Sequence, residues 1–145
     1  MQEGFRFAPK LALRRLDRLT VSLERLAALG DRLGPLRLVI ESPRDEGLLT
    51  YVLGSVDPAV ELAFDLRHES WDGVEGLVRV NDLEAEPFRY VRLREPPYAD
   101  GDLAALAETL RPPAYVYFRH EEAPTAPAYA ERLRGLLTGA PPPPA

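Results

Sequence analysis

The sequence predicts an α/β fold with a mainly parallel sheet. Short runs rich in apolar residues alternate with stretches in which leucine recurs at every third or fourth position. Strand and helix alternation of this kind is built from right-handed crossovers, which join parallel strands. A chain of 145 residues has room for one such domain with a core of its own.

Six strands are predicted, and all of them alternate apolar with polar side chains. Strands buried on both faces are almost continuously apolar, whereas this alternation predicts one face against helices and an opposite face that is polar and basic. In the third strand Leu62, Phe64 and Leu66 would face helices, and Asp65 and Arg67 the other side. A barrel with a polar interior and an open sheet with one wet face both fit this pattern. The predicted strands are residues 4–10, 36–42, 60–67, 77–82, 89–95 and 114–120.

Four helices are predicted between and after these strands. The first has leucine at positions 16, 19, 23 and 26 and ends near Gly30, and the second begins after Asp45. The third has Asp100 as its N-cap and ends before Pro112, and the fourth has Thr125 as a candidate cap. No internal linker is evident, so residues 1–138 are predicted to form a single domain. The proline-rich residues 139–145 are predicted to be a disordered tail.

Composition narrows the classes of partner. The formal net charge of −5 opposes general attraction to nucleic acid or to anionic membranes. Without cysteine there is no disulfide and no thiolate ligand. No apolar run approaches the roughly 20 residues of a membrane helix, and the first residues lack the pattern of a signal peptide. We therefore expect a cytoplasmic protein that contacts no membrane and needs no cofactor.

The segment ELAFDLRHESW, residues 61–71, concentrates chemistry at the end of a predicted strand. Asp65 and Arg67 share a face, so the carboxylate would hold the guanidinium in position for an anion. A structural ion pair is the alternative. His68 is a candidate proton donor or a capping residue, and Trp71 is either a packing anchor or a surface on which a ligand stacks.

Histidine and lysine are two further residue types that could contact a ligand. His68 and His120 follow matching strand ends, but no known metal-ligand spacing accompanies them, so no metal is expected. Lys10 is the only lysine and ends the first predicted strand, where it would contact an anion.

Several stretches resemble the YecE-like proteins, also known as domain of unknown function 72. They are GFRFAPK, LGDRLGPLRLVIESP, ELAFDLRHESW, YVRLRE, YADGDLAALAETL and AYVYFRHEEAPTAPAYAERLRGLL, together spanning about residues 4 to 137. The strand that ends in an acid, with Arg-His and then Ser-Trp after it, is the most specific of them. This resemblance implies a relative of TIM-type (β/α) barrels, shortened to about six strands, with its site at the carboxyl ends of the strands. The family's activity is not established.

The expected function is therefore binding of a small phosphorylated or carboxylated molecule. Lys10, Arg67, Arg92 and Arg119 would hold the anion, Asp65 would orient Arg67, and acid–base chemistry would fall to His68. The alternative is a non-catalytic binding or interaction module that completes its sheet as a homodimer. By strand alternation the basic face collects eight cations, Arg6, Lys10, Arg37, Arg67, Arg79, Arg92, Arg94 and Arg119, against the three carboxylates Glu41, Glu61 and Asp65.

Overall fold

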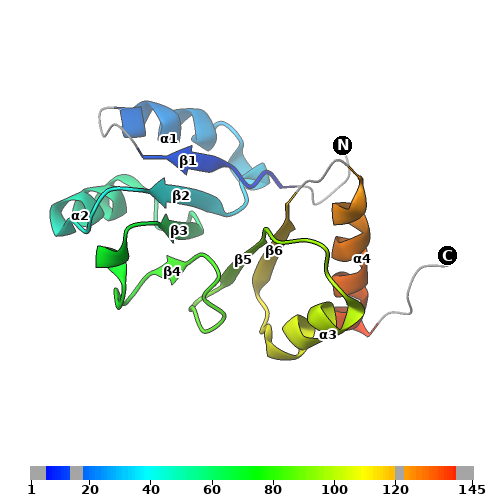
Figure 1. Ribbon diagram of the computed structural model, residues 1–145. Coiled ribbons are helices and arrows are strands. Elements are labelled where there is room, and N and C mark those ends of the chain that lie inside the picture. Colours follow the sequence, from blue (N-terminus) through cyan, green and yellow to red (C-terminus); the bar gives the residue numbers. More distant parts are fainter. Residues whose placement is uncertain (1–5, 14–17, 120–122, 140–145) are drawn as a thin grey trace. The chain divides into compact units, whose positions relative to one another are not determined.

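The chain forms two compact units, residues 1–79 and 80–145 (Figure 1). The computed structural model describes residues 6–13, 18–119 and 123–139. Each unit contains parallel strands and helices, so the predicted α/β class is confirmed. Within the described ranges the strands form one sheet of four and one of two, and no closed barrel. The assignment of residues 1–138 to a single domain stays a prediction.

The amino-terminal unit is built on the four-stranded sheet, in the order β1-β2-β3-β4, with every neighbouring pair parallel. The helices α1 and α2 follow the first and second strands, as a parallel sheet with crossovers requires. The elements are β1 (Lys10–Ala12), α1 (Leu19–Ala27), the 3-10 turn η2 (Gly30–Arg32), β2 (Leu36–Ile40), α2 (Glu46–Ser55), β3 (Leu62–Leu66), the 3-10 turn η3 (Glu69–Trp71) and β4 (Val78–Arg79).

One face of this sheet forms the core with the two helices. The register pairs Leu38 with Phe64 and Ile40 with Leu66, so four apolar side chains lie side by side. Three of them belong to a buried cluster with Trp71 and with Leu19 of α1 and Leu49, Val52 and Val56 after the second strand, and Leu66 packs against it. The predicted apolar face is therefore confirmed.

The opposite face departs from the expectation of an open, wet surface. All five residues of β2 are buried, including Arg37 at 5% exposure. Arg79 was also assigned to the wrong face: it pairs with Phe64 and so lies on the helix side, where it donates to the carbonyl oxygen of Trp71 at 3.5 Å. In a strand of two residues the pairing register, rather than alternation, decides which side chain faces the core.

The first strand begins later than predicted. Phe7 makes only an isolated bridge to Leu33, and continuous pairing with β2 starts at Lys10. Pro9 lies between them and has no N–H to give to the ladder, which separates the two pairings. Phe7 is 40% exposed and not in the core, while Phe5 and Leu16 lie outside the described residues.

The carboxyl-terminal unit pairs β5 (Arg89–Leu93) with β6 (Ala114–Phe118) in parallel and adds α3 (Asp100–Thr109) and α4 (Thr125–Thr138). Phe118 packs its ring against Tyr98 and against Tyr129 of α4, at 5.8 Å between ring centroids in both cases. Tyr90 and Tyr117 lie on the other face of this pair of strands, with their ring centroids 5.0 Å apart. Phe118 therefore faces α4, as predicted, but exposure does not alternate in β5, because Tyr90 and Val91 are both buried, at 4% and 3% exposure.

The helix starts follow the predictions only in part. The Asp45 carboxylate caps α2 by accepting from the N–H of Leu48 at 3.1 Å, as expected. Asp100 and Thr125, by contrast, are the first residues of their helices, with Ala99 and Pro124 at the N-cap positions. None of the helices in the described ranges is long and apolar enough to cross a bilayer.

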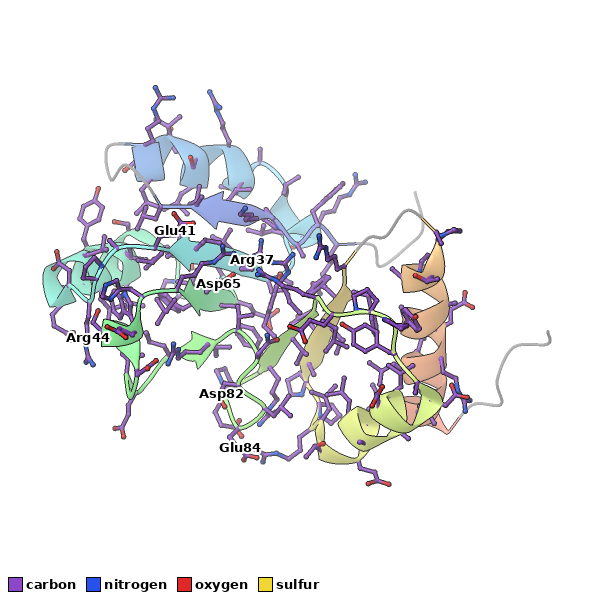
Figure 2. The ribbon with its side chains drawn as sticks, viewed as in Figure 1. Arg37, Glu41, Arg44, Asp65, Asp82 and Glu84 are labelled. Carbon is purple, nitrogen blue, oxygen red and sulfur yellow. The ribbon has the colours of Figure 1, made fainter. Side chains whose placement is uncertain are left out.

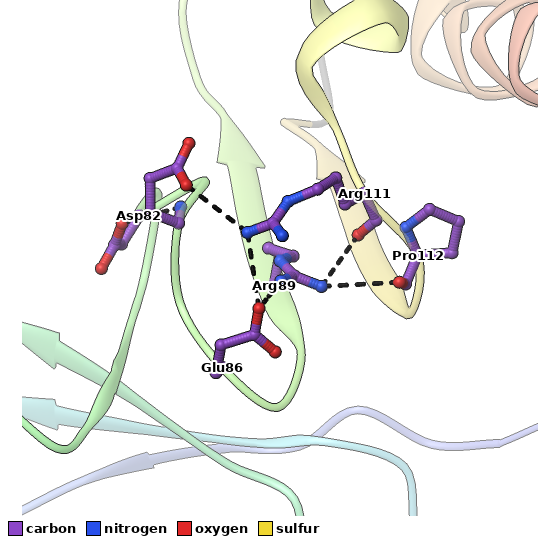
Figure 3. Close-up of polar contacts among 6 residues, drawn as sticks. Asp82, Glu86, Arg89, Arg111 and Pro112 are labelled. Carbon is purple, nitrogen blue, oxygen red and sulfur yellow. Dashed lines mark hydrogen bonds and ion pairs between the residues drawn. The ribbon is translucent and has the colours of Figure 1, made fainter.

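A buried arginine, Arg89, organises the loop that leads into β5, and no sequence pattern predicted its burial. Arg89 is 2% exposed. Its Nη1 donates to the carbonyl oxygen of Arg111 at 3.2 Å, and its Nη2 donates to the Glu86 carboxylate (Figure 3). Arg111 lies 3.4 Å from both Glu86 and Glu84. This network joins the loop before β5 to the loop before β6, because one guanidinium donates to both.

Asn81 takes the place of a neighbouring strand on the outer edge of β5. Its backbone N–H donates to the carbonyl oxygen of Tyr90 at 2.8 Å, and its side-chain oxygen accepts from the N–H of Arg92 at 2.7 Å. A parallel neighbour would make both bonds with backbone groups. Here the backbone turns away with a φ of 68°, and the side chain supplies the acceptor. The predicted strand 77–82 accordingly pairs only at Val78 and Arg79.

We expect Phe64→Ala to lower the free energy of unfolding by about 3–5 kcal/mol, because it leaves a cavity in the core. Phe7→Ala is the matched control, since the same side chain there is 40% exposed against 2% for Phe64. Its expected cost is below about 1.5 kcal/mol. Urea denaturation followed by circular dichroism measures both. Equal costs would show that Phe64 does not face the helices.

Two substitutions separate the roles of Asn81. Asn81→Gly removes the side-chain acceptor and keeps the positive φ, so we expect a loss of about 1 kcal/mol. Asn81→Ala removes the acceptor and adds strain at that φ, so its loss should be larger by roughly another 1 kcal/mol. Hydrogen exchange at the Arg92 amide should accelerate in both variants. An unchanged rate would contradict the edge contact.

Candidate functional site

The carboxyl ends of β2 and β3 are joined by backbone and side-chain hydrogen bonds. Arg67 continues the ladder by donating its N–H to the carbonyl oxygen of Ile40 at 3.0 Å. The N–H of Arg44 donates to the Ser70 hydroxyl oxygen at 2.7 Å, and the Trp71 indole donates to the carbonyl oxygen of Ser42 at 2.9 Å. The loop after each strand is therefore positioned by the other, and together they present a fixed rim.

Four ionisable side chains are linked by ion pairs near this rim, Arg37, Glu41, Asp65 and Arg67, which we call the Asp65 cluster. Figure 2 labels the first three of them. Asp65 accepts from Nε and Nη2 of Arg67 at 3.4 and 3.3 Å, a two-pronged contact. The same carboxylate lies 3.6 Å from Nη1 of Arg37. Glu41 is 3.9 Å from Nη1 of Arg67. The predicted pairing of Asp65 with Arg67 is confirmed, and Arg37 is an additional partner.

Exposure divides the cluster into an inner and an outer half. The side chains of Arg37 and Asp65 are 6% and 14% exposed, whereas those of Arg67 and Glu41 are 38% and 61% exposed. The inner pair is therefore the less accessible half of the cluster. Among the residues that the structure describes, Nη1 of Arg67 makes no contact closer than its ion pair with Glu41, so it retains donors for a ligand.

The predicted excess of positive charge is absent from the Asp65 cluster. Two guanidiniums face two carboxylates there. Since Arg79 lies on the helix side, the amino-terminal unit contributes fewer cations to the polar face than alternation predicted. An anion site here would therefore depend on Nη1 of Arg67 rather than on an excess of positive side chains.

The backbone of Lys10 lies away from this rim. Lys10 begins β1 and pairs with Arg37, which in turn pairs with Ala63. The Cα of Arg67 is four residues beyond that of Ala63, or about 13 Å along the strand at roughly 3.3 Å per residue. The expectation that Lys10 ends its strand was wrong, because continuous pairing with β2 begins at Lys10.

His68 and Trp71 both make structural contacts. The His68 Nδ1 accepts from the N–H of Ser70 at 3.1 Å and so caps the η3 turn, leaving Nε2 as the nitrogen able to exchange a proton with a ligand. Trp71 has no exposed surface and belongs to the core cluster, which supports packing over stacking. Sequence reasoning missed Ser42 as the partner of Trp71 and Arg44 as the partner of Ser70, because no local pattern marks a hydrogen bond between two loops.

The remaining predicted ligand-binding residues belong to the carboxyl-terminal unit. Arg92 lies in β5 beside Tyr117, and its backbone N–H is taken by Asn81. Arg119 follows β6 and donates its N–H to the carbonyl oxygen of Leu93 at 2.8 Å. His120 lies outside the described residues. In the described ranges no three side chains of His, Asp or Glu gather closely enough to hold a metal ion.

Comparison with known proteins adds no relative. Searches of family models, curated proteins and solved structures gave no match to this chain.

Removing the inner carboxylate should cost far more than removing an outer one. Asp65→Ala leaves a buried guanidinium without this carboxylate, and we expect a loss of about 3 kcal/mol in unfolding free energy. Asp72→Ala removes the partner of Arg79, but Asp72 is 78% exposed, so we expect less than about 1 kcal/mol. Chemical denaturation of both variants measures the difference. Similar losses would show that the Asp65 carboxylate does not stabilise the buried guanidinium of Arg37.

Proposed function

We propose that this chain is a shortened relative of the YecE-like barrels and binds a small anion at the carboxyl ends of β2 and β3. The observation that carries the proposal is the state of Arg67. Its guanidinium is held by two contacts to Asp65 and is partly exposed, and its Nη1 makes only the 3.9 Å ion pair with Glu41 among the described contacts. A guanidinium held in this way presents its fork to a carboxylate or phosphate with little further loss of side-chain freedom.

The position of Arg67 also supports anion binding. In open α/β sheets, ligands bind outside the carboxyl ends of the strands, where the loops can differ without disturbing the core. The loops after β2 and β3 hold each other there through Ser42, Arg44 and Ser70. Glu41 is the one carboxylate of the cluster that would oppose an anion, and an incoming ligand has to displace it from Arg67.

The contacts of Asp65 and His68 favour ligand binding without catalysis. Asp65 is occupied by two guanidiniums and His68 caps a turn, so both candidates for acid–base chemistry serve local structure. A non-catalytic binding module is consistent with these contacts. Acid–base chemistry by His68 would have to proceed through Nε2.

Anion binding should depend on Arg67 and be opposed by Glu41. We expect inorganic phosphate at about 100 times its Kd to stabilise the fold by roughly 2.7 kcal/mol. Arg67→Ala should abolish most of this gain, and Arg67→Lys should weaken it because the fork is lost. Glu41→Gln should tighten binding by about two- to fivefold, the size expected from removing an exposed like charge. Thermal melts at constant ionic strength and calorimetric titrations measure these effects, with oxalate as the carboxylate probe.

Arg134→Ala is the matched control, because Arg134 is an exposed arginine of α4. It should retain the whole response to phosphate. A response that survives in Arg67→Ala, or that chloride reproduces at equal ionic strength, would contradict an anion site at Arg67.

A further inference from the structure

A cavity of about 850 Å³ opens at the amino ends of β2 and β3, at the other end of these strands from the Asp65 cluster. One wall is α1, and the other is the loop that leads from α2 into β3. The turn η2, the following Leu33, the start of β2 at Leu36 and Arg6 complete the lining. Every lining residue belongs to the amino-terminal unit, so the cavity is a property of that unit alone.

Leucine and valine side chains form the apolar part of the cavity lining. Leu23 and Leu26 come from α1, and Val56 and Val60 from the opposite loop. Leu23 and Leu26 are only partly buried, and Leu23 also packs against the core cluster. Pockets for small molecules have volumes of about 300–1,000 Å³ and apolar walls, so both size and lining fit a small organic ligand.

The polar groups around the cavity are mostly acidic. Its lining includes four carboxylates, Glu24, Asp31, Asp57 and Glu61, and one guanidinium, that of Arg6. Four negative groups against one positive leave an excess of three negative charges. Within the described part of the chain, Glu24 and Asp31 make no ion pair with Lys, Arg or His. The Asp57 carboxylate accepts only the N–H of Ala59, at 2.9 Å, among its described contacts.

We propose that this cavity binds a small amphipathic organic cation, an amine attached to an apolar body. The apolar body would displace water from the leucine and valine walls, and the ammonium group would pair with Glu24 and Asp31. An anion of the same shape would meet a net negative rim, and a neutral ligand would gain only the apolar contacts. A bare metal ion does not fit, because the walls are apolar and no described cluster of three or more ligating side chains lies here.

Three ligands that share one alkyl chain test the proposal: octylammonium, octanol and octanoate. Titration of the whole chain, followed by amide chemical shifts in NMR spectra, should give the tightest binding for octylammonium. We expect at least about a tenfold preference over octanol, as one charge-assisted contact provides, and the weakest binding for octanoate. The shifts should map to α1 and to residues 55–61.

Variants separate the charge from the cavity. Combining Glu24→Gln with Asp31→Asn should reduce the preference for octylammonium over octanol to less than about threefold, without abolishing octanol binding. Val60→Trp should fill the space and weaken all three ligands. Glu108→Gln, at an exposed carboxylate of α3, is the matched control and should change nothing.

Three results would overturn the proposal: equal affinity for the three ligands, shifts that map elsewhere, or sedimentation showing that a second copy of the chain covers the cavity. The charge variants alter exposed side chains, so they provide the test even if Val60→Trp fails to fold. Arg67→Ala should leave octylammonium binding intact, which separates this outcome from that of the proposed anion site.

Discussion

The register of β2 against β3 is the constraint on which the amino-terminal unit depends. It places Leu38 beside Phe64 on the helix side and Val39 beside Asp65 on the other. A shift by one residue would turn the Asp65 carboxylate into the apolar core and expose Phe64. The cost of burying an ionised carboxylate among leucines makes that alternative pairing unfavourable, so the same residues that form the core also fix the position of the ion pairs.

The loops at the carboxyl ends derive their order from this register. Because Arg67 extends the pairing of β3 with β2, the chain leaves both strands at the same level. Ser70 and Trp71 then form hydrogen bonds with the loop after β2, and the Trp71 side chain belongs to the core cluster. The run of charged residues after β3 is therefore accounted for first by architecture. The ligand binding that we propose for this run depends on Nη1 of Arg67.

The two ends of this sheet differ in chemistry. At the carboxyl ends an arginine is held by a half-buried carboxylate, whereas at the amino ends four carboxylates belong to the lining of a cavity. Parallel sheets ordinarily use the carboxyl ends for ligands. At the amino ends, a cavity lies between α1 and the start of β2, which is why we propose a second site there. The opposite preferences for charge keep the two proposed sites chemically distinct within one small unit.

What the sequence by itself determined is the set of elements and the faces of the longer strands. Apolar spacing located the helices, and alternation assigned Phe64 and Asp65 to opposite sides, because side-chain period is a local property of the backbone. Tertiary structure alone decided the start of β1 after Pro9, the side taken by Arg79, the Asn81 contact that replaces a strand, and the partners of Arg89. Each of these depends on pairing register or on a contact between distant loops. Such contacts follow from how elements meet in space, which the pattern of any single segment does not contain.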